Sequence, residues 1–239
     1  MRPRRRHREV WISKTFVNFR RRWWYLRRMT TYLGSALESS IRDRKLLSHP
    51  FYRRWEAGGL SIEELRLYAE QYRYFEEMLP QFLQQLADQL PEGFARESVQ
   101  KNLADEISSP SHLELFERFA DFYRASPAPI SPAMKRLVDA YYDVLTQSPA
   151  TALAGLWAYE SQGASISDSK AEGLSNHYAA SDEALAFWLA HGTIEGDHAR
   201  WTLEALEELQ PDEETVRDAT RRIGEAWWEF LDERELIAA

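Results

Sequence analysis

The chain has 239 residues, no cysteine and a formal net charge of −8. This length is enough to bury one substantial core, and the lack of cysteine excludes disulfides, thiolate catalysis and iron–sulfur ligation. Any metal must therefore be held by nitrogen and oxygen atoms. No apolar run approaches the roughly 20 residues that span a bilayer, so we expect a cytoplasmic protein without a membrane span.

The first 28 residues differ sharply in charge from the rest of the chain. Met1–Arg28 carries eleven of the 30 Lys and Arg residues and one of the 38 acids, which leaves 19 basic and 37 acidic residues for the remainder. Such an acidic body disfavours polyanions, so we expect no nucleic-acid binding. Residues 1–28 are interpreted either as a membrane-surface or targeting segment, or as a non-native, disordered extension that a start codon ahead of Met29 would produce. The folded domain is expected to occupy residues 29–239.

From Met29 onward the sequence predicts an all-α bundle of about seven to nine helices. Apolar residues recur at spacings of three and four, and the breaks fall at Pro or Gly. Ser61 and Glu64 form the sequence pattern of a capping box, which opens a long helix that contains Pro80. A looser stretch is expected at 165–180. The expected helices are 33–47, a short one after Pro50, 61–90, 92–107, 111–123, 131–146, 149–163, 182–209 and a last one from Pro211.

The segment FWLAHGTIEGDHARW contains the sharpest chemical signal. On a helix, His191, Glu195 and His198 lie within about 60° of one another and can point at one spot. Their neighbours are largely apolar, and two imidazoles and a carboxylate are costly on such a face unless they are paired or coordinated. The motif therefore predicts a metal site, with a solvated polar stripe as the alternative.

Two further segments supply candidate ligands. In NLADEISSPSHLELF an acidic pair, Asp105 and Glu106, precedes His112, and Pro110 breaks the helix between them. The alternative for this segment is an acidic helix cap and a loop histidine. Glu160 lies in GLWAYESQGASI, on an otherwise small and apolar helix where a lone carboxylate needs a partner. Three imidazoles and three carboxylates suit two first-row metals such as iron or manganese with open positions for dioxygen, so we expect oxidation chemistry.

Almost the whole of residues 29–235 resembles a known family. The string HPFYRRWEAGGLSIEELRLYAEQYRYF is similar to the N-terminal signature of the heme-oxygenase-like superfamily, which includes thiaminase II (TenA-like proteins) and the pyrroloquinoline quinone biosynthesis oxidase. The pieces DE followed by a histidine, YES, and H-x-x-x-[DE]-x-x-H resemble the heme-oxygenase-like dimetal oxidases, and within them the branch of the chlamydial protein associating with death domains. The spacing from acid to histidine is one residue shorter here than in the chlamydial pattern, so Asp105 remains an alternative to Glu106. The ligands that the resemblance implies are Glu106, His112, Glu160, His191, Glu195 and His198.

The resemblance also implies a function. That branch is associated with making para-aminobenzoate, the folate precursor, from the protein's own tyrosine. Tyr52 would supply the ring and Lys170 the amino nitrogen in a self-sacrificing reaction that uses two metal ions (Fe/Fe or Mn/Fe), dioxygen and an external reductant. The lysine would need a lowered pKa, which burial gives. Tyr159, next to Glu160, would hydrogen-bond the site or carry a radical.

Other interpretations stay open at this level. Tyr52 could be an ordinary half-buried tyrosine and Lys170 a solvated surface residue. The chain could instead be a dimetal oxygenase that acts on an external small molecule by N-oxygenation or C–C cleavage, or a helical protein-interaction module. The resemblance also makes a homodimer plausible, and the electron donor stays unknown.

Overall fold

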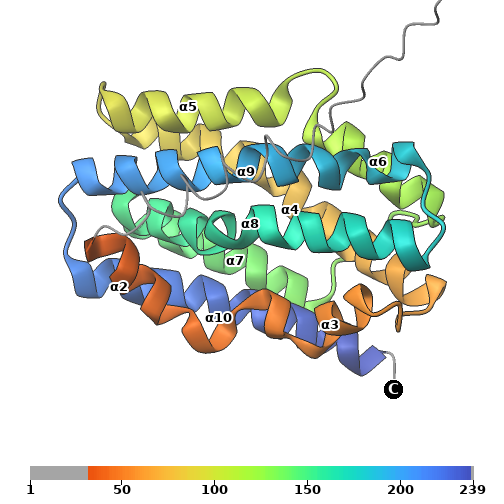
Figure 1. Ribbon diagram of the computed structural model, residues 1–239. Coiled ribbons are helices and arrows are strands. Elements are labelled where there is room, and N and C mark those ends of the chain that lie inside the picture. Colours follow the sequence, from red (N-terminus) through yellow and green to blue (C-terminus); the bar gives the residue numbers. More distant parts are fainter. Residues whose placement is uncertain (1–31, 238–239) are drawn as a thin grey trace, which may run out of the picture.

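The computed structural model describes residues 32–237, and within this range every regular element is a helix (Figure 1). The all-α prediction is thereby confirmed. The basic extension 1–28 lies outside the described residues. The α-helices are α2 (Tyr32–Ser40), α3 (Pro50–Glu56), α4 (Ile62–Gln89), α5 (Phe94–Ile107), α6 (His112–Phe122), α7 (Pro132–Gln147), α8 (Pro149–His177), α9 (Asp182–Glu208) and α10 (Glu213–Ile237).

Two predicted boundaries were wrong. The helix expected at 33–47 ends at Ser40 and is followed by two 3₁₀ turns, Arg42–Arg44 and Leu46–Ser48. The helix expected at 149–163 continues to His177, so the stretch 165–180 is mostly helical rather than loose. Its Ser, Asp and Gly residues are typical of loops, but Ile166, Lys170 and Leu174 are buried at a spacing of four. Tertiary packing of this face overrides the weak local preference for helix.

Local caps fix where the helices that surround the site begin. Ser61 accepts a hydrogen bond from the Glu64 backbone N–H while the Glu64 carboxylate accepts one from the Ser61 N–H, which confirms the predicted capping box at the start of α4. Ser111 and Glu114 form the same reciprocal pair at the start of α6. His112 therefore occupies the first helical position of α6, directly after a rigid cap.

The two long helices α8 and α9 lie side by side through the middle of the molecule (Figure 1). Helices α5 and α6 pack against α9, α10 and α7 pack against α8, and α4 contacts α5, α6 and α7. Candidate site residues on α5, α6 and α8 are therefore carried by helices that all contact α9, which carries the others. Among the described residues, no helix is both long and apolar enough to cross a membrane.

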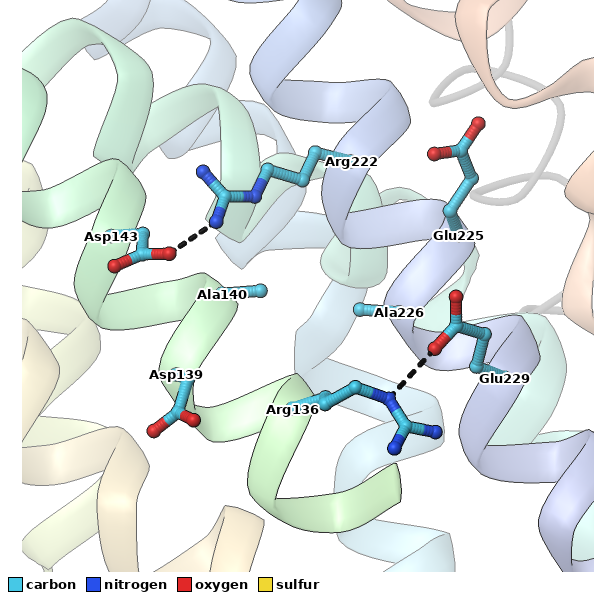
Figure 2. A pocket seen from close by; sticks show the side chains of 8 residues that line it. All are labelled: Arg136, Asp139, Ala140, Asp143, Arg222, Glu225, Ala226 and Glu229. Atoms are coloured by element: carbon cyan, nitrogen blue, oxygen red, sulfur yellow. Dashed lines mark hydrogen bonds and ion pairs between the residues drawn. The ribbon is translucent and has the colours of Figure 1, made fainter. Parts of the chain in front are cut away.

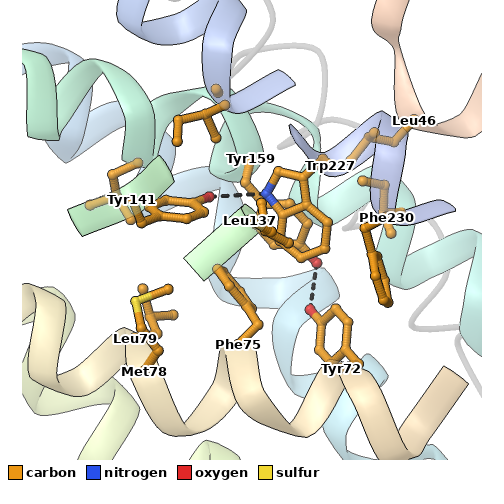
Figure 3. Close-up of a cluster of buried hydrophobic side chains, with 14 of the residues drawn as sticks. Leu46, Tyr72, Phe75, Met78, Leu79, Leu137, Tyr141, Tyr159, Trp227 and Phe230 are labelled. Carbon is orange, nitrogen blue, oxygen red and sulfur yellow. Dashed lines mark hydrogen bonds between the residues drawn. The ribbon is translucent and has the colours of Figure 1, made fainter. Parts of the chain in front are cut away.

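Aromatic side chains form much of the core between α4, α7, α8 and α10 (Figure 3). Phe75 meets Trp227 edge to face at 4.7 Å between ring centroids, and Trp227 stacks on Tyr159 at 4.5 Å. The Trp227 indole N–H donates to the Tyr141 hydroxyl at 3.0 Å. Such pairs add to the stabilisation from burial and hold the rings in fixed orientations. The result is a packed cluster of aromatic rings that includes Tyr159, the residue before Glu160.

A surface groove lies between α7 and α10 (Figure 2). Ala140 and Ala226 line it, and an ion pair crosses it between Arg136 and Glu229 at 3.0 Å. Arg222 and Asp143 form a second ion pair across the same groove. None of the predicted site residues line it, and exposed pairs of this kind contribute little to stability. The chemistry lies elsewhere, inside the bundle.

Candidate metal centre

Three of the predicted ligands converge between α5, α6 and α9. Glu106, His112 and His191 are all buried, and one ligand atom from each lies within 4.8 Å of the other two. The His112 Nδ1 atom is 2.7 Å from a Glu106 carboxylate oxygen. Pro110 lies between the end of α5 and the cap of α6, and the chain turns there so that acid and imidazole face the same point. The break that the sequence predicts thus brings the two side chains together.

The predicted face of α9 also lies inside the protein. His191, Glu195 and His198 are exposed by only 5%, 4% and 1%, so the solvated-stripe interpretation is wrong. The His191 Nδ1–H donates to the Phe187 carbonyl at 2.9 Å, which leaves Nε2 with its lone pair free for coordination. This Nε2 atom is 3.8 Å from a Glu195 oxygen. Burial lowers the pKa of His191 to about 3, so the imidazole is neutral at physiological pH, as a metal ligand must be.

The acidic pair on α5 divides between two histidines. Glu106 is 3% exposed and lies beside His112, whereas the Asp105 side chain is 41% exposed. An Asp105 oxygen is 3.2 Å from the His198 Nε2 atom. Glu106 thus lies inside the centre beside His112, whereas the more exposed Asp105 lies at its rim beside His198.

Glu160 on α8 is held by neighbours rather than placed in the tight group of three. One oxygen accepts a hydrogen bond from the Asn102 side-chain amide and the other from the Thr202 hydroxyl, both at 2.6 Å. Burial raises the pKa of Glu160 to about 8, against the two hydrogen bonds, which lower it. Asn102 on α5 and Thr202 on α9 thereby orient this carboxylate between the helices that carry the other ligands.

The polar atoms at this point fit a bound cation. The Glu195 Oε2 atom is buried and has no hydrogen-bond partner, which is costly in a protein interior. Burial and the nearby Glu160 raise the pKa of Glu195 well above its ordinary value. Iron or manganese would give this oxygen a partner, and both metals accept mixed imidazole and carboxylate ligands. The donor set therefore fits a metal centre.

Gly163 makes room for Glu195 where α8 and α9 cross. A Cβ atom added at Gly163 would lie 2.8 Å from the Glu195 carboxyl carbon. A side chain at this position would push the carboxylate aside. The close packing of the two central helices thus depends on a glycine opposite a predicted ligand.

The two residues predicted as reactants meet in an aromatic chamber beside this centre. Lys170 is 1% exposed and Tyr52 is 2% exposed, so the interpretations of a solvated lysine and a half-buried tyrosine are wrong. The Lys170 Nζ atom donates to the Tyr68 hydroxyl at 2.5 Å and lies 4.5 Å from the centroid of the Tyr52 ring. The Tyr52 and Tyr68 hydroxyls are 3.0 Å apart. Burial lowers the pKa of Lys170 well below its ordinary value, and the negative charge of Glu76 opposes this shift.

Tyr159 connects the chamber with the centre. Its hydroxyl is 2.6 Å from that of Tyr72. Figure 3 marks this contact with a dashed line. Tyr159 also precedes Glu160 in the chain. Tyr72 stacks on Tyr68 at 5.3 Å between ring centroids. A line of aromatic side chains therefore joins the neighbourhood of Glu160 to the Tyr52 and Lys170 pair.

Sequence reasoning gave no role to Tyr68 or to Glu76, which are both buried on α4. A signal was present, because Tyr68, Tyr72 and Glu76 recur every four residues and share one face of the helix. An acid that continues a stripe of tyrosines is unusual for a core face. Only the packing of α4 within the bundle shows that this acid is buried rather than exposed.

Comparison with known proteins agrees with these observations. Residues 66–230 match the sequence model of a family described as iron-containing redox enzymes. The chain is 34% identical over 223 residues to a 4-aminobenzoate synthase of Nitrosomonas europaea, covering 85% of this chain and 91% of the relative. It is 29% identical to a 4-aminobenzoate synthase of Chlamydia muridarum, covering 82% and 87%. A crystal structure of a TenA homolog from Pseudomonas syringae has the same fold, with a TM-score of 0.73, 16% identity and coverage of 86% and 93%.

Proposed function

Because the chain belongs to the family of iron-containing redox enzymes, we propose that it makes para-aminobenzoate by oxidising its own Tyr52, with Lys170 as the donor of the amino nitrogen. The relatives named 4-aminobenzoate synthase support para-aminobenzoate as the product. The buried contacts in the chamber support Tyr52 as the source of its ring and Lys170 as the source of its nitrogen. The observation that carries the proposal is the Tyr68 hydroxyl, which hydrogen-bonds both the Tyr52 hydroxyl and the Lys170 amine.

In this proposal two metal ions are held by the six predicted side chains. When bound, the metals supply one-electron oxidation driven by dioxygen and an external reductant. Iron and manganese share these ligands, so the donor set does not distinguish Fe/Fe from Mn/Fe. The proposed ligands are Glu106, His112, Glu160, His191, Glu195 and His198.

The residues of the chamber prepare the two reactants. The product carries nitrogen where the Tyr52 ring now carries its hydroxyl, and a carboxylate where the ring now carries Cβ. Its formation therefore breaks the ring C–O bond, the Cα–Cβ bond of Tyr52 and the Cε–Nζ bond of Lys170, with dioxygen as the oxidant and the external reductant as the electron source. Nζ of Lys170 already lies over the face of the Tyr52 ring. Burial favours the neutral amine, whose lone pair is required for bond formation. Burial also raises the pKa of Tyr52, so the phenol keeps its proton until it is oxidised. The Tyr68 oxygen is the hydrogen-bond partner through which that proton can leave.

Water is excluded from this pair by a cage of aromatic rings. The Lys170 Nζ atom lies 4.2 Å from the centroid of Trp188 and 4.9 Å from that of Tyr72. A dry site protects an oxidised ring from hydrolysis and keeps the amine without a proton. The cage therefore fits chemistry between two side chains of the same protein better than turnover of a diffusing substrate.

The test is intact mass and peptide mapping after aerobic reaction with metal and reductant. We expect released para-aminobenzoate in less than about one equivalent per chain, together with covalent change at Tyr52 and Lys170. Tyr52→Phe and Lys170→Arg should abolish product. Tyr74→Phe and Lys135→Arg are matched controls, because Tyr74 is only partly buried and Lys135 is exposed.

Two outcomes would overturn the proposal. Released product with Tyr52 unmodified, or multiple turnovers by Tyr52→Phe, would indicate a dimetal oxygenase that acts on an external substrate. A chain that binds no iron or manganese would indicate a helical interaction protein. Elemental analysis of protein purified without added metal distinguishes the second outcome from the first.

A further inference from the structure

His49 is a buried histidine that belongs neither to the six proposed ligands nor to the two proposed reactants. Its side chain is 0% exposed, and it occupies the N-cap position of α3, three residues before Tyr52. The imidazole meets Trp228 of α10 edge to face, with 4.6 Å between the ring centroids. A polar ring in such a place is costly unless both of its nitrogens have partners.

The partners of His49 fix both its proton and its orientation. The Phe51 backbone N–H donates to Nδ1 at 3.1 Å, so Nδ1 carries no proton. The ring proton therefore lies on Nε2, which donates to an Asp232 oxygen of α10 at 3.1 Å. At the other end of α3, Arg54 donates to Glu235 of α10, also at 3.1 Å. Helix α3 is thus tied to α10 at both ends, and the buried tie is His49.

The position of Tyr52 depends on these ties because α3 is short. A helix of seven residues has too few internal hydrogen bonds to be stable on its own. Tyr52 lies in its first turn, whereas its partners lie on other helices. The Tyr68 hydroxyl of α4 is 3.0 Å from the Tyr52 hydroxyl, and Nζ of Lys170 on α8 is 4.5 Å from the ring centroid. A shift of α3 therefore changes both distances at once.

We propose that His49 is a positioning residue, which caps α3 and ties it to α10 so that the Tyr52 ring stays at the reacting distance from Lys170. This inference rests on the proposed function, because it takes Tyr52 and Lys170 as the reactants. Reacting groups that are displaced by about 1 Å can lose about a hundredfold in rate. The cap acts in the same turn of α3 that carries Tyr52, so its loss displaces the reacting ring directly.

The experiment compares His49→Phe, His49→Asn and Ser131→Ala in the full chain. Phenylalanine keeps a ring against Trp228 but accepts no hydrogen bond, whereas asparagine is among the best capping residues. Ser131 caps α7, which carries no proposed ligand or reactant, by accepting from the Met134 N–H. It is therefore a matched control for the loss of one cap.

Two quantities are measured, the rate of para-aminobenzoate formation with metal, dioxygen and reductant, and bound metal by elemental analysis. We expect His49→Phe to form product tenfold or more slowly with unchanged metal content. His49→Asn should remain within about threefold of wild type, and Ser131→Ala should equal it. Asp232→Ala removes the tie at its exposed end, so it should fold whatever the effect of His49→Phe, and it should form product at least threefold more slowly.

Hydrogen exchange provides a measurement that is independent of the reaction. The amides of α3 should exchange at least tenfold faster in His49→Phe than in wild type or Ser131→Ala, while those of α4 and α8 are unchanged. Product formation at the wild-type rate by both His49→Phe and Asp232→Ala would refute the role of His49 alone. An equal loss in Ser131→Ala, or reduced metal in His49→Phe, would also overturn it. A wild type that forms no product would refute the proposed function, and with it any role of His49 in the reaction.

Discussion

Replacing Glu160 with Gln should stabilise the metal-free protein while it weakens metal binding. The ordinary pKa of this carboxyl is 4.5, and burial raises it to about 8 in the folded state. Between these values the folded protein keeps a proton that the unfolded chain releases, so the stability of wild type falls as pH rises through this window. One pKa unit corresponds to about 1.4 kcal/mol, and the penalty is therefore about 1 kcal/mol at pH 5 and about 3 kcal/mol at pH 7.

Glutamine can keep the contacts of the protonated acid. Its amide oxygen accepts from Asn102, and its amide N–H donates to the Thr202 hydroxyl, at the positions where both contacts now measure 2.6 Å. Because Gln does not titrate, the free energy of unfolding of Glu160→Gln should exceed that of wild type by about 1 kcal/mol at pH 5 and about 3 kcal/mol at pH 7.

The assay is urea unfolding of chelator-treated protein from pH 5 to pH 8, with Glu172→Gln as the control. Glu172 lies on the same helix, and its side chain is exposed. Addition of Mn²⁺ should reverse the order, because a ligand of the folded state stabilises wild type more. A Glu160→Gln variant that is less stable than wild type without metal, or whose advantage does not change with pH, would refute the reasoning.

Three further predictions follow from the packing. Gly163→Ala should displace the Glu195 carboxylate and weaken metal binding measured by chelator competition, whereas Gly196→Ala, which meets nothing within 4 Å, should leave binding unchanged. Lys170→Met should raise the free energy of unfolding at pH 7, because burial of Lys170 disfavours its charged amine in the folded state of wild type. This gain should shrink as pH approaches 10.5, and a gain equal at pH 7 and pH 9.5 would contradict it. Ser61→Ala should lower stability by about 1 kcal/mol in urea unfolding through loss of the α4 cap, and altered metal affinity would show that the cap acts on the centre as well.

The sequence by itself determined the helical class, most helix positions and the ligand face of α9. These features are local, because the spacing of apolar residues and the capping residues act within one or two turns. His191, Glu195 and His198 could be grouped because one helix fixes their relative directions. The absence of cysteine fixed the kind of ligand, and the resemblance supplied the pairing of Tyr52 with Lys170.

Only the tertiary structure decided which side chains meet across helices. The polar sequence around Lys170 hides a buried helical face, and the burial follows from packing against α3 and α9. The position of Glu106 beside His112, with Asp105 at the rim, depends on how α5 and α6 meet. Contacts between helices depend on distances that no local periodicity encodes, and in this protein those contacts bring Lys170 to Tyr52, and Glu106 to His112 and His191.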